Sequence, residues 1–297
     1  MKKALYRLLN FFICMTVVDC LMGNVFSYLK ANAKSGVNID NKFIKDSVNA
    51  DVLVFGSSRS LRHYDPYLIA DSLDLSCYIC GMNSNGIITN FARFQSIMKR
   101  YTPKIIIYDI MPSFDVAKED NSKYVQQLRE NGNDGFSPNM ISIIDPFDKI
   151  KSLSKMYRNN SSLFSLIVEN QTIPENRNKG YHPYKDSMRY ESNFERSSCT
   201  VDSLKLDLFK KMIIESKRKG VLLAFFVSPA YKKDYYSSTK PIELLCRKEG
   251  IPFFNDNFVH GISDHRDNFH DSVHLNEAGS EKYTKLVIKQ IKGLSSK

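Results

Sequence analysis

The chain has 297 residues, enough to bury a full core in one large domain with or without an insertion. Its 42 basic and 32 acidic residues give a formal net charge of +10. The basic residues are scattered, and no zinc-finger spacing or dense arginine run accompanies them, so we expect no nucleic-acid partner. An anionic polymer or a membrane surface suits this charge as well.

Residues 1–30 are predicted to form a membrane anchor. Three basic residues within the first seven precede an apolar run over residues 8–29, a length that suits one bilayer crossing. The positive-inside rule keeps this end cytoplasmic, and no clear small-x-small cleavage site follows, which favours an uncleaved signal-anchor. Asn10 and Asp19 count against a spanning helix, because polar groups are costly in a bilayer. The alternative is a buried amphipathic helix.

Residues 31–49, with Ser, Gly, Asn and Lys, are predicted to be a linker. They lead into residues 50–297, which we expect to form one domain. Nothing else in the sequence is long and apolar enough to span a bilayer. The chain is therefore predicted to be a single-pass membrane protein with this domain outside the cytoplasm.

A buried strand and an abrupt turn begin the domain. Residues 51–55 are mostly apolar and rich in β-formers, as expected for a parallel strand covered on both faces. Gly56 permits a tight turn, and Ser57 and Ser58 are candidate N-caps for the next helix. Open α/β sheets place their sites at this end of a strand. The alternative is an ordinary Gly-Ser-Ser helix cap.

Helix and strand patterns then alternate as far as residue 112. The predicted elements are a helix at 61–73 broken at Pro66, a strand at 77–82, a turn at 81–86, a helix at 87–101 and a strand at 105–110.

An insertion is predicted over about residues 113–200, where the periodicity fails. Helices are expected at 141–155 and 161–168. Long irregular stretches in compact domains are usually functional or disordered, so we expect this one to cover or line a site and decide the substrate. Its aromatic residues offer faces for sugar stacking, with ordinary packing as the alternative: Tyr157, Tyr181, His182, Tyr184 and Tyr190.

Regular patterns return near the C-terminus. They predict a helix at 201–219, a strand at 221–227, a helix at 241–248, a strand at 251–254 and a helix at 277–292. Strands that alternate with helices indicate a mainly parallel sheet covered on both faces. The predicted fold is a three-layer α/β/α flavodoxin-like sandwich with an inserted irregular and helical segment.

Asp271 and His274 lie three residues apart, just before the last helix. At this spacing a carboxylate can hold one imidazole nitrogen and leave the other free to take a proton from a serine. A serine needs such a base because its hydroxyl is otherwise a poor nucleophile. The alternative is a polar loop whose histidine is a cap.

Together, the two ends of the domain resemble the GDSL-type (SGNH) esterase and acyltransferase superfamily. Gly56-Ser57-Ser58 is similar to its first block, and Asp271-Ser272-Val273-His274 to its last. The Gly-Ser-Ser-Arg form and the long insertion most resemble membrane-anchored bacterial members that act on acylated envelope or exported polymers. The resemblance covers roughly residues 50–110 and 200–293. It implies Ser58 as nucleophile, with Ser57 and Ser60 as alternatives by spacing.

The resemblance also implies an oxyanion hole. The Ser58 backbone N–H is one candidate donor, and the second block corresponds to Gly81 through Ser84, with Asn83 between them and Ser84 where glycine is usual. The third block normally supplies an asparagine side chain, but this chain has no asparagine there. Asp109 takes its place, and an ionised carboxylate only accepts hydrogen bonds.

Three residues could supply the donor that the third block lacks: Asn83, Asn85 and Ser113. Arg59 and Arg62 flank the nucleophile. They could clamp a carboxylate or phosphate of the substrate, or pair with acidic residues such as Asp65 and Asp109.

The resemblance therefore implies a membrane-tethered serine esterase or O-acyltransferase that acts on an acylated glycan outside the cytoplasm, through an acyl-serine and without a cofactor. No metal site is expected, because the six cysteines have no zinc-type spacing. The alternative, favoured by the missing asparagine, is a catalytically degraded binding or scaffold protein of an envelope-polymer assembly.

Overall fold

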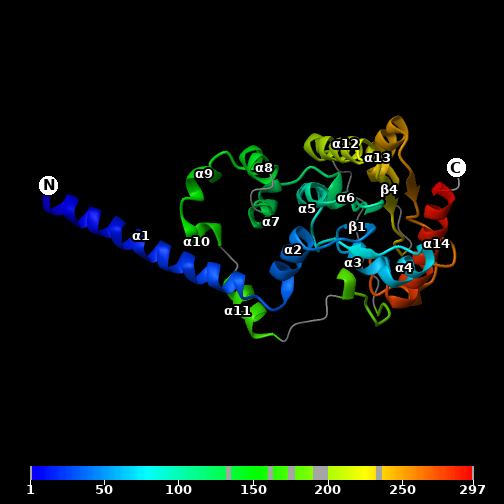
Figure 1. Ribbon diagram of the computed structural model, residues 1–297, viewed down its shortest axis with the longest axis horizontal. Helices are drawn as coiled ribbons and strands as arrows, with labels where there is room; N and C mark the ends of the chain where they lie inside the picture. The colour runs from blue at the N-terminus through cyan, green and yellow to red at the C-terminus, as the bar shows by residue number, and fades with distance from the viewer. Residues whose placement is uncertain are drawn as a thin grey trace. The chain divides into compact units, whose positions relative to one another are not determined.

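The computed structural model describes residues 2–131, 135–159, 163–172, 178–189, 200–231 and 236–295. The chain divides into two compact units, each described by itself below (Figure 1). Unit 1 comprises Met1–Phe43 and Asn121–Asn176, and unit 2 comprises Ile44–Asp120 and Arg177–Lys297. The predicted insertion is therefore shared between the units, because only its middle part groups with the N-terminal helix.

Unit 2 is built on a five-stranded parallel sheet in the order β2-β1-β3-β4-β5. The strands are β1 (Val52–Gly56), β2 (Cys77–Ile79), β3 (Ile105–Asp109), β4 (Leu222–Val227) and β5 (Phe253–Asn255). The three central strands are almost wholly buried, which explains their unbroken apolar runs. This strand order is the flavodoxin-like one. The chain adds β2 on one side of β1 and then β3, β4 and β5 on the other, so the order of the strands switches between β1 and β3.

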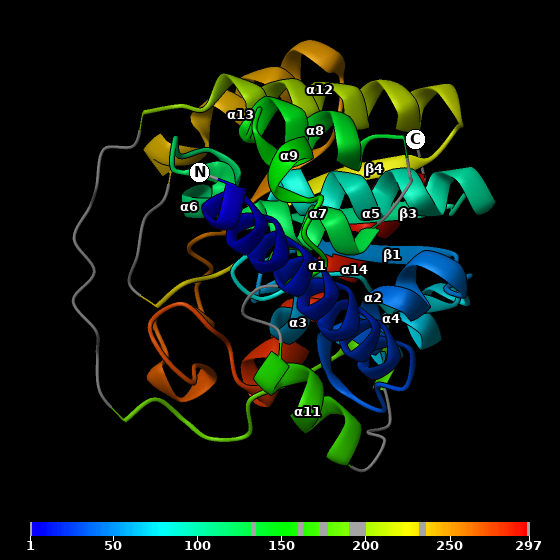
Figure 2. The ribbon, with the colours of Figure 1, turned by 90° about the vertical axis from the view of Figure 1, so that its left-hand side faces the viewer.

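Helices cover both faces of this sheet (Figure 2). One layer holds α5 (Ile87–Arg100), α12 (Ser203–Arg218) and α13 (Tyr236–Glu249), and the other holds α3 (Ser60–His63), α4 (Pro66–Leu73) and α14 (Glu277–Ser295). Alternate strand residues face opposite layers. Val54 and Phe226 join the core cluster that includes α14 residues, whereas Phe225 packs on Phe209 of α12. The predicted three-layer α/β/α fold is confirmed.

Element boundaries differ from the predictions in a few places. The helix predicted from Leu61 is two helices, because Asp65 caps α4 and Pro66 occupies its first turn. Helix α13 begins five residues before Pro241, at Tyr236. Residues 31–49, predicted to be a linker, contain helix α2 (Gly36–Asp46). Three short elements complete unit 2: α6 (Pro112–Asp115), η2 (Asn178–Gly180) and η3 (Arg266–Asn268).

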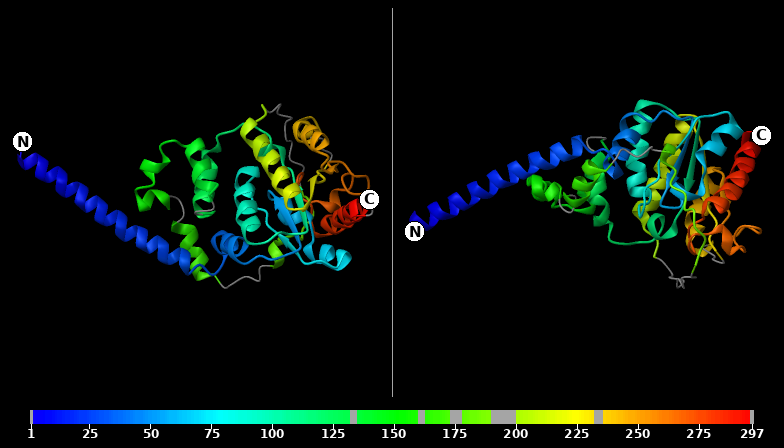
Figure 3. Two further views of the ribbon diagram at one scale, coloured as in Figure 1. Left: turned by 45° about the horizontal axis from the view of Figure 1, so that its top comes forward. Right: turned by 90° about the horizontal axis from the view of Figure 1, so that it is seen from below.

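Unit 1 is helical in the part that the structure describes. Its elements are α1 (Lys2–Ala31), η1 (Asn121–Tyr124), α7 (Val125–Asn131), α8 (Ser137–Ile144), α9 (Asp148–Lys151), α10 (Lys155–Arg158) and α11 (Leu163–Gln171). Helix α1 is long and apolar enough to cross a membrane. Both α10 and α11 pack against it, and Figure 3 shows its N-terminal part reaching beyond the other helices of unit 1.

Asp19, the residue that argued against a spanning helix, has a defined role in unit 1. Its carboxylate accepts hydrogen bonds from the Ser154 hydroxyl at 2.6 Å and from the backbone N–H groups of Lys155 and Met156 at 2.8 and 2.9 Å. These are free donors at the first turn of α10. Asp19 therefore holds α10 against α1, and its carboxylate is hydrogen-bonded within unit 1.

Candidate active site

The turn after β1 brings Ser58 to the carboxyl edge of the sheet. Gly56 has φ +141°, and a Cβ there would lie 2.6 Å from the Asp109 carbonyl oxygen and 3.1 Å from Ser60 Cβ. Only glycine fits this approach of β1 to β3. Ser58 follows directly, beside the point where the strand order reverses, which is where open α/β sheets bind their ligands.

Ser58, His274 and Asp271 form a connected row of side chains. Ser58 Oγ lies 2.8 Å from His274 Nε2, and His274 Nδ1 lies 2.8 Å from Asp271 Oδ2. A carboxylate only accepts, so Nδ1 carries the proton and Nε2 is free to accept from the serine. The alternative nucleophiles do not face this histidine, because Ser57 and Ser60 are fully buried and the Ser60 hydroxyl donates to the Ser57 carbonyl.

The loop that carries His274 is held by backbone hydrogen bonds. Asp271 Oδ1 accepts the N–H groups of Val273 and His274 at 2.8 and 2.9 Å. Partial burial acts to raise the pKa of Asp271, but the hydrogen bond and charge of His274, with these backbone donors, outweigh it and lower the pKa to about 2. Asp271 is therefore ionised at neutral pH and stabilises an imidazolium.

Two backbone N–H groups near Ser58 make no hydrogen bond within the described part of the chain: those of Ser58 itself and Gly81. Gly81 follows β2, and a Cβ there would overlap Ser60 Oγ at 1.8 Å, so glycine is required for the two turns to approach each other. Unpaired N–H groups of this kind are suited to an oxyanion.

Asn83 is fixed beside these donors by an arginine. Arg62 Nη1 donates to Asn83 Oδ1 at 2.8 Å and to the Ser58 carbonyl oxygen at 3.1 Å. Because a guanidinium has no acceptor, the Asn83 oxygen must face Arg62, and its NH₂ group is left as a donor. Ser84 adopts φ +55°, a left-handed conformation that explains why glycine is usual at the corresponding position of the second block.

Arg59 and Asp109 are paired with each other, one of the two arrangements predicted for them. Both side chains are fully buried and form an ion pair, with Arg59 Nε 3.6 Å from Asp109 Oδ2. The Arg59 guanidinium also donates to the carbonyl oxygens of Ser228 and Ile110. Burial raises the pKa of Asp109, and the Arg59 charge opposes that rise. The alternative prediction, a structural pairing of the two residues, is the one that holds.

A buried histidine escaped the sequence analysis. Leu275 N–H donates to His63 Nε2 at 2.9 Å, His63 Nδ1 lies 2.8 Å from Ser228 Oγ, and that hydroxyl donates to Asp109 Oδ2 at 2.9 Å. Burial lowers the pKa of His63 well below its usual value, with the Arg59 charge acting in the same direction. This neutral histidine thus anchors the residue next to His274. No local motif marks it, because its partners lie far apart in sequence.

The end of the insertion packs beside the triad. Tyr184 stacks on His270 with ring centroids 3.7 Å apart, meets the edge of His274 at 5.8 Å, and lies 4.5 Å from the Arg62 guanidinium. His270 Nδ1 also lies 2.8 Å from Asp186. Tyr184 is thus the one predicted aromatic whose ring contacts His274 in the described part of the chain.

The other aromatic residues of the insertion have different surroundings. Tyr181 is buried against Ser280, Tyr157 stacks with Arg129 in unit 1, and the His182 N–H donates to the Leu61 carbonyl oxygen. Tyr190 lies outside the described residues.

Cysteines and acidic residues show no metal-type grouping. In the part of the chain that the structure describes, no three histidine, cysteine, aspartate or glutamate side chains are placed to hold a metal. Cys14, Cys20, Cys77, Cys80 and Cys246 are free thiols, and Cys199 lies outside the described residues.

No protein-family model and no curated protein match this sequence. Several solved structures are similar to it in three dimensions, and two of them are described here. One, from Desulfitobacterium hafniense DCB-2, is assigned to the G-D-S-L family of lipolytic proteins; it is 10% identical, with a TM-score of 0.39, and the match covers 80% of this chain and 97% of the other. The second, a GDSL-like lipase from Bacteroides thetaiotaomicron VPI-5482, is 11% identical, with a TM-score of 0.39 and coverages of 91% and 98%.

At this identity and TM-score, neither likeness bears on the activity of this chain, which has to be inferred from its own residues.

Proposed function

We propose that the chain is a serine esterase or O-acyltransferase that acts on an acylated glycan of the cell envelope or of an exported polymer. The observation that carries this proposal is the row Ser58–His274–Asp271, joined by two contacts of 2.8 Å. A serine, an imidazole and a carboxylate in this order are the groups that acyl transfer needs.

The chemistry follows from the protonation states of the row. Ser58 Oγ attacks the ester carbonyl carbon while His274 Nε2 takes the hydroxyl proton. His274 then gives this proton to the departing sugar oxygen as the C–O bond breaks, and an acyl-serine remains. Water or another sugar hydroxyl then attacks the acyl carbon while His274 takes its proton; the bond from Ser58 Oγ to the acyl carbon breaks, His274 returns the proton to Ser58, and the carboxylic acid or the new ester leaves. Hydrolysis and transfer differ only in this acceptor.

We assign the oxyanion hole to three donors: the backbone N–H groups of Ser58 and Gly81 and the side-chain NH₂ of Asn83. Among the described residues the first two have no hydrogen-bond partner, and Arg62 orients the third. Asn83 would then replace the asparagine that the third block lacks. Asn85 is less suited to this role, because its NH₂ group already donates to the Asn83 carbonyl oxygen.

Labelling with a fluorophosphonate tests the proposal. Such probes phosphonylate only a serine that has been activated by a base. We expect the wild type to be labelled and Ser58→Ala not to be, while Ser57→Ala keeps its label because that side chain is buried. An unlabelled wild type that is correctly folded would favour the rival, a degraded binding or scaffold protein of a polymer assembly.

The membrane placement belongs to the same proposal. Helix α1 is long and apolar enough to cross a bilayer, and Lys2, Lys3 and Arg7 lie at its start. We therefore place the N-terminus in the cytoplasm and unit 2 outside. A reporter that is active only after export, fused after Lys297, should be active. Reporter activity in the cytoplasm, together with soluble fractionation, would contradict this orientation.

A further inference from the structure

The inserted helices of unit 1 expose large apolar side chains in an unusual concentration. Between residues 143 and 156, five such side chains follow one another at intervals of three or four residues, each 40–80% exposed: Ile143, Phe147, Ile150, Leu153 and Met156. We call residues 143–156 the apolar arm. Isolated exposed apolar residues are ordinary on protein surfaces, but five within fourteen residues make this segment a candidate for contact with another apolar body.

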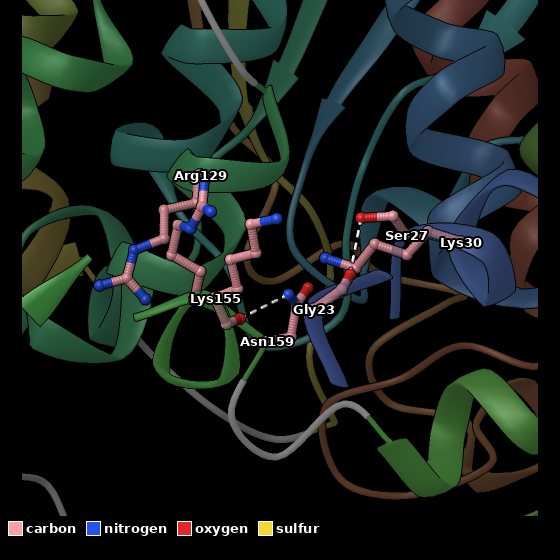
Figure 4. Close-up of a pocket in the computed structure, with 7 residues that line it drawn as sticks. Gly23, Ser27, Lys30, Arg129, Lys155 and Asn159 are labelled. Atoms are coloured by element: carbon pink, nitrogen blue, oxygen red, sulfur yellow. Dashed lines mark hydrogen bonds between the residues drawn. The ribbon is translucent and has the colours of Figure 1, made fainter. Parts of the chain in front are cut away.

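A cationic pocket lies between the apolar arm and α1. Its volume is about 240 Å³, and it is lined by Gly23, Ser27, Lys30, Arg129, Lys155, Arg158 and Asn159. Figure 4 shows Arg129 and Lys155 opposite Ser27 and Lys30 of α1. Four of the lining residues are basic and none is acidic.

Most of this positive charge is not neutralised by the chain. Arg129 is held by an ion pair with Asp148 and by stacking on Tyr157. In the described part of the chain, Lys30 and Arg158 form no ion pair with an acidic side chain, and Lys155 feels the charge of Asp19 without an ion-pair contact. Uncompensated cations around one hollow are suited to an anionic ligand such as a phosphate group.

The contacts of α1 place both features relative to a bilayer. Asp19 caps α10, and Gly23 packs so tightly on Lys155 that a Cβ would overlap it. Lys2, Lys3 and Arg7 precede the crossing, which therefore begins near Leu8. About 20 residues at 1.5 Å each cross roughly 30 Å of hydrocarbon, which places the outer bilayer surface near Ser27. Helix α10, held at Asp19 and Gly23, then lies in the outer leaflet, and the pocket, lined by Ser27 and Lys30, lies at the depth of the headgroups.

We propose that unit 1 is a membrane-surface module. The apolar arm enters the outer edge of the bilayer that α1 crosses, and the cationic pocket binds the phosphate of an anionic phospholipid. This inference rests on the membrane anchor of the proposed function and goes beyond it, because it gives the inserted helices a partner. The positive charge of the pocket and the direct packing of α10 on the spanning helix favour a lipid surface over a second copy or another protein.

The apolar arm can be tested with a single fluorescent residue, because the chain contains no tryptophan. Full-length Leu153→Trp is reconstituted into vesicles of phosphatidylcholine with brominated acyl chains. We expect its emission to be blue-shifted and quenched about twofold or more, since bromine quenches only at contact and the arm enters the acyl boundary. Phe258→Trp, at an exposed position of unit 2, is the matched control and should not be quenched. Equal emission from both variants would overturn the inference.

The pocket is tested by asking which lipid surrounds the apolar arm. Leu153→Trp is reconstituted into two kinds of vesicle that both contain phosphatidylglycerol and phosphatidylcholine. In one kind the phosphatidylglycerol is brominated, in the other the phosphatidylcholine is, and the total amount of bromine is the same. We expect stronger quenching from brominated phosphatidylglycerol. Lys155→Gln with Arg158→Gln should lower that preference about fivefold for each charge removed, whereas Lys210→Gln with Lys289→Gln, exposed in unit 2, should leave it unchanged.

Three outcomes would contradict the pocket assignment. One is no preference between the lipids, another is a preference that survives the double substitution, and the third is a preference that inorganic phosphate removes, which would assign the pocket to a soluble anion. Failure here is distinguishable from failure of the proposed esterase, because fluorophosphonate labelling of Ser58 in detergent depends on neither the arm nor the lipid.

Discussion

The two units differ in where their apolar side chains go. In unit 2, Val52, Val54, Phe55 and Phe225 are completely buried between two helical layers. In unit 1, Phe147 and Leu153 are 67% and 80% exposed, as is most of α1. A sheet covered by its own helices removes its apolar side chains from water within the chain, and this burial stabilises the fold. Exposed apolar helices gain the same stabilisation only if a membrane or another molecule covers them. Unit 2 therefore buries its own apolar core, whereas unit 1 leaves apolar surface that suits the membrane partner proposed for it.

Deleting residues 121–176 is the most severe test of this comparison. These residues contribute nothing to the sheet or to the triad, so a chain closed with a flexible linker should still hydrolyse a small aryl acetate. We expect its action on the membrane-associated acylated glycan to be lost. Both activities are measured on the same preparation, with Ser58→Ala in the deleted chain as the blank. Normal activity on the polymer would mean that the inserted helices do not serve catalysis at the membrane.

Asp271→Asn should reduce kcat about 10⁴-fold without unfolding unit 2. An asparagine NH₂ group can donate to His274 Nδ1, which stabilises the wrong tautomer and removes the base. Asp186→Asn is the matched control, since Asp186 holds His270 at the same 2.8 Å but lies outside the proposed triad. The rate of aryl acetate hydrolysis gives kcat for each variant, and circular dichroism spectra show whether each variant is folded. A similar loss in both variants would refute the assigned roles.

Asn83→Ala should lower kcat about 10²- to 10³-fold, which is the usual effect of losing one oxyanion donor. Because the donor acts on charge that develops in the transition state, KM should change much less than kcat. Asn85→Ala serves as the comparison, since its NH₂ group is already bonded to the Asn83 carbonyl oxygen. If Asn83→Ala retains the wild-type kcat, the missing third-block donor is supplied elsewhere.

Asp115 should make unit 2 sensitive to pH. Burial raises the pKa of Asp115 to about 7, although hydrogen bonds from Met111 N–H and the Tyr108 hydroxyl oppose that rise. Folded chains therefore keep a proton that unfolded chains lose near pH 4. The free energy of unfolding should fall as pH rises from about 4 to about 7 and change little through this group above that.

Melting temperatures measured across this pH range, in wild type and Asp115→Asn, test the contribution of Asp115. The variant has no proton to lose at this position, so its melting temperature should fall less over the same interval. Parallel curves for the two proteins would show that Asp115 does not titrate in this way.

Ser84→Gly should stabilise unit 2 by about 1 kcal/mol, because a φ of +55° is strained for serine and free of strain for glycine. Ser84→Ala keeps the strain and should show no gain. Thermal unfolding of the three proteins provides the comparison. A stabilised alanine variant would point to the serine hydroxyl, not to the backbone, as the source of the effect.

Much of unit 2 could be predicted because its signals are local. The apolar run before Gly56 and the three-residue spacing of Asp271 and His274 each lie within one strand or loop. The aromatic residues of the insertion were harder to interpret. Tyr184 and Tyr181 look alike in sequence, yet only Tyr184 contacts the catalytic histidine, because that contact depends on how residues 178–189 pack against α3 and the His274 loop.

The sequence by itself determined the parallel α/β sandwich, the serine turn, the histidine loop and one apolar helix, because periodicity, turn chemistry and short spacing act between neighbouring residues. Only the tertiary structure decided that Arg59 is a buried partner of Asp109, that His63 and Ser228 support the loop of His274, and that Asp19 caps a helix of the insertion. These roles join residues 50 to more than 160 positions apart. The sequence around a polar side chain does not show which distant residue it will hydrogen-bond with. A partner becomes necessary only when folding buries the side chain, because a buried polar group without a hydrogen bond is costly.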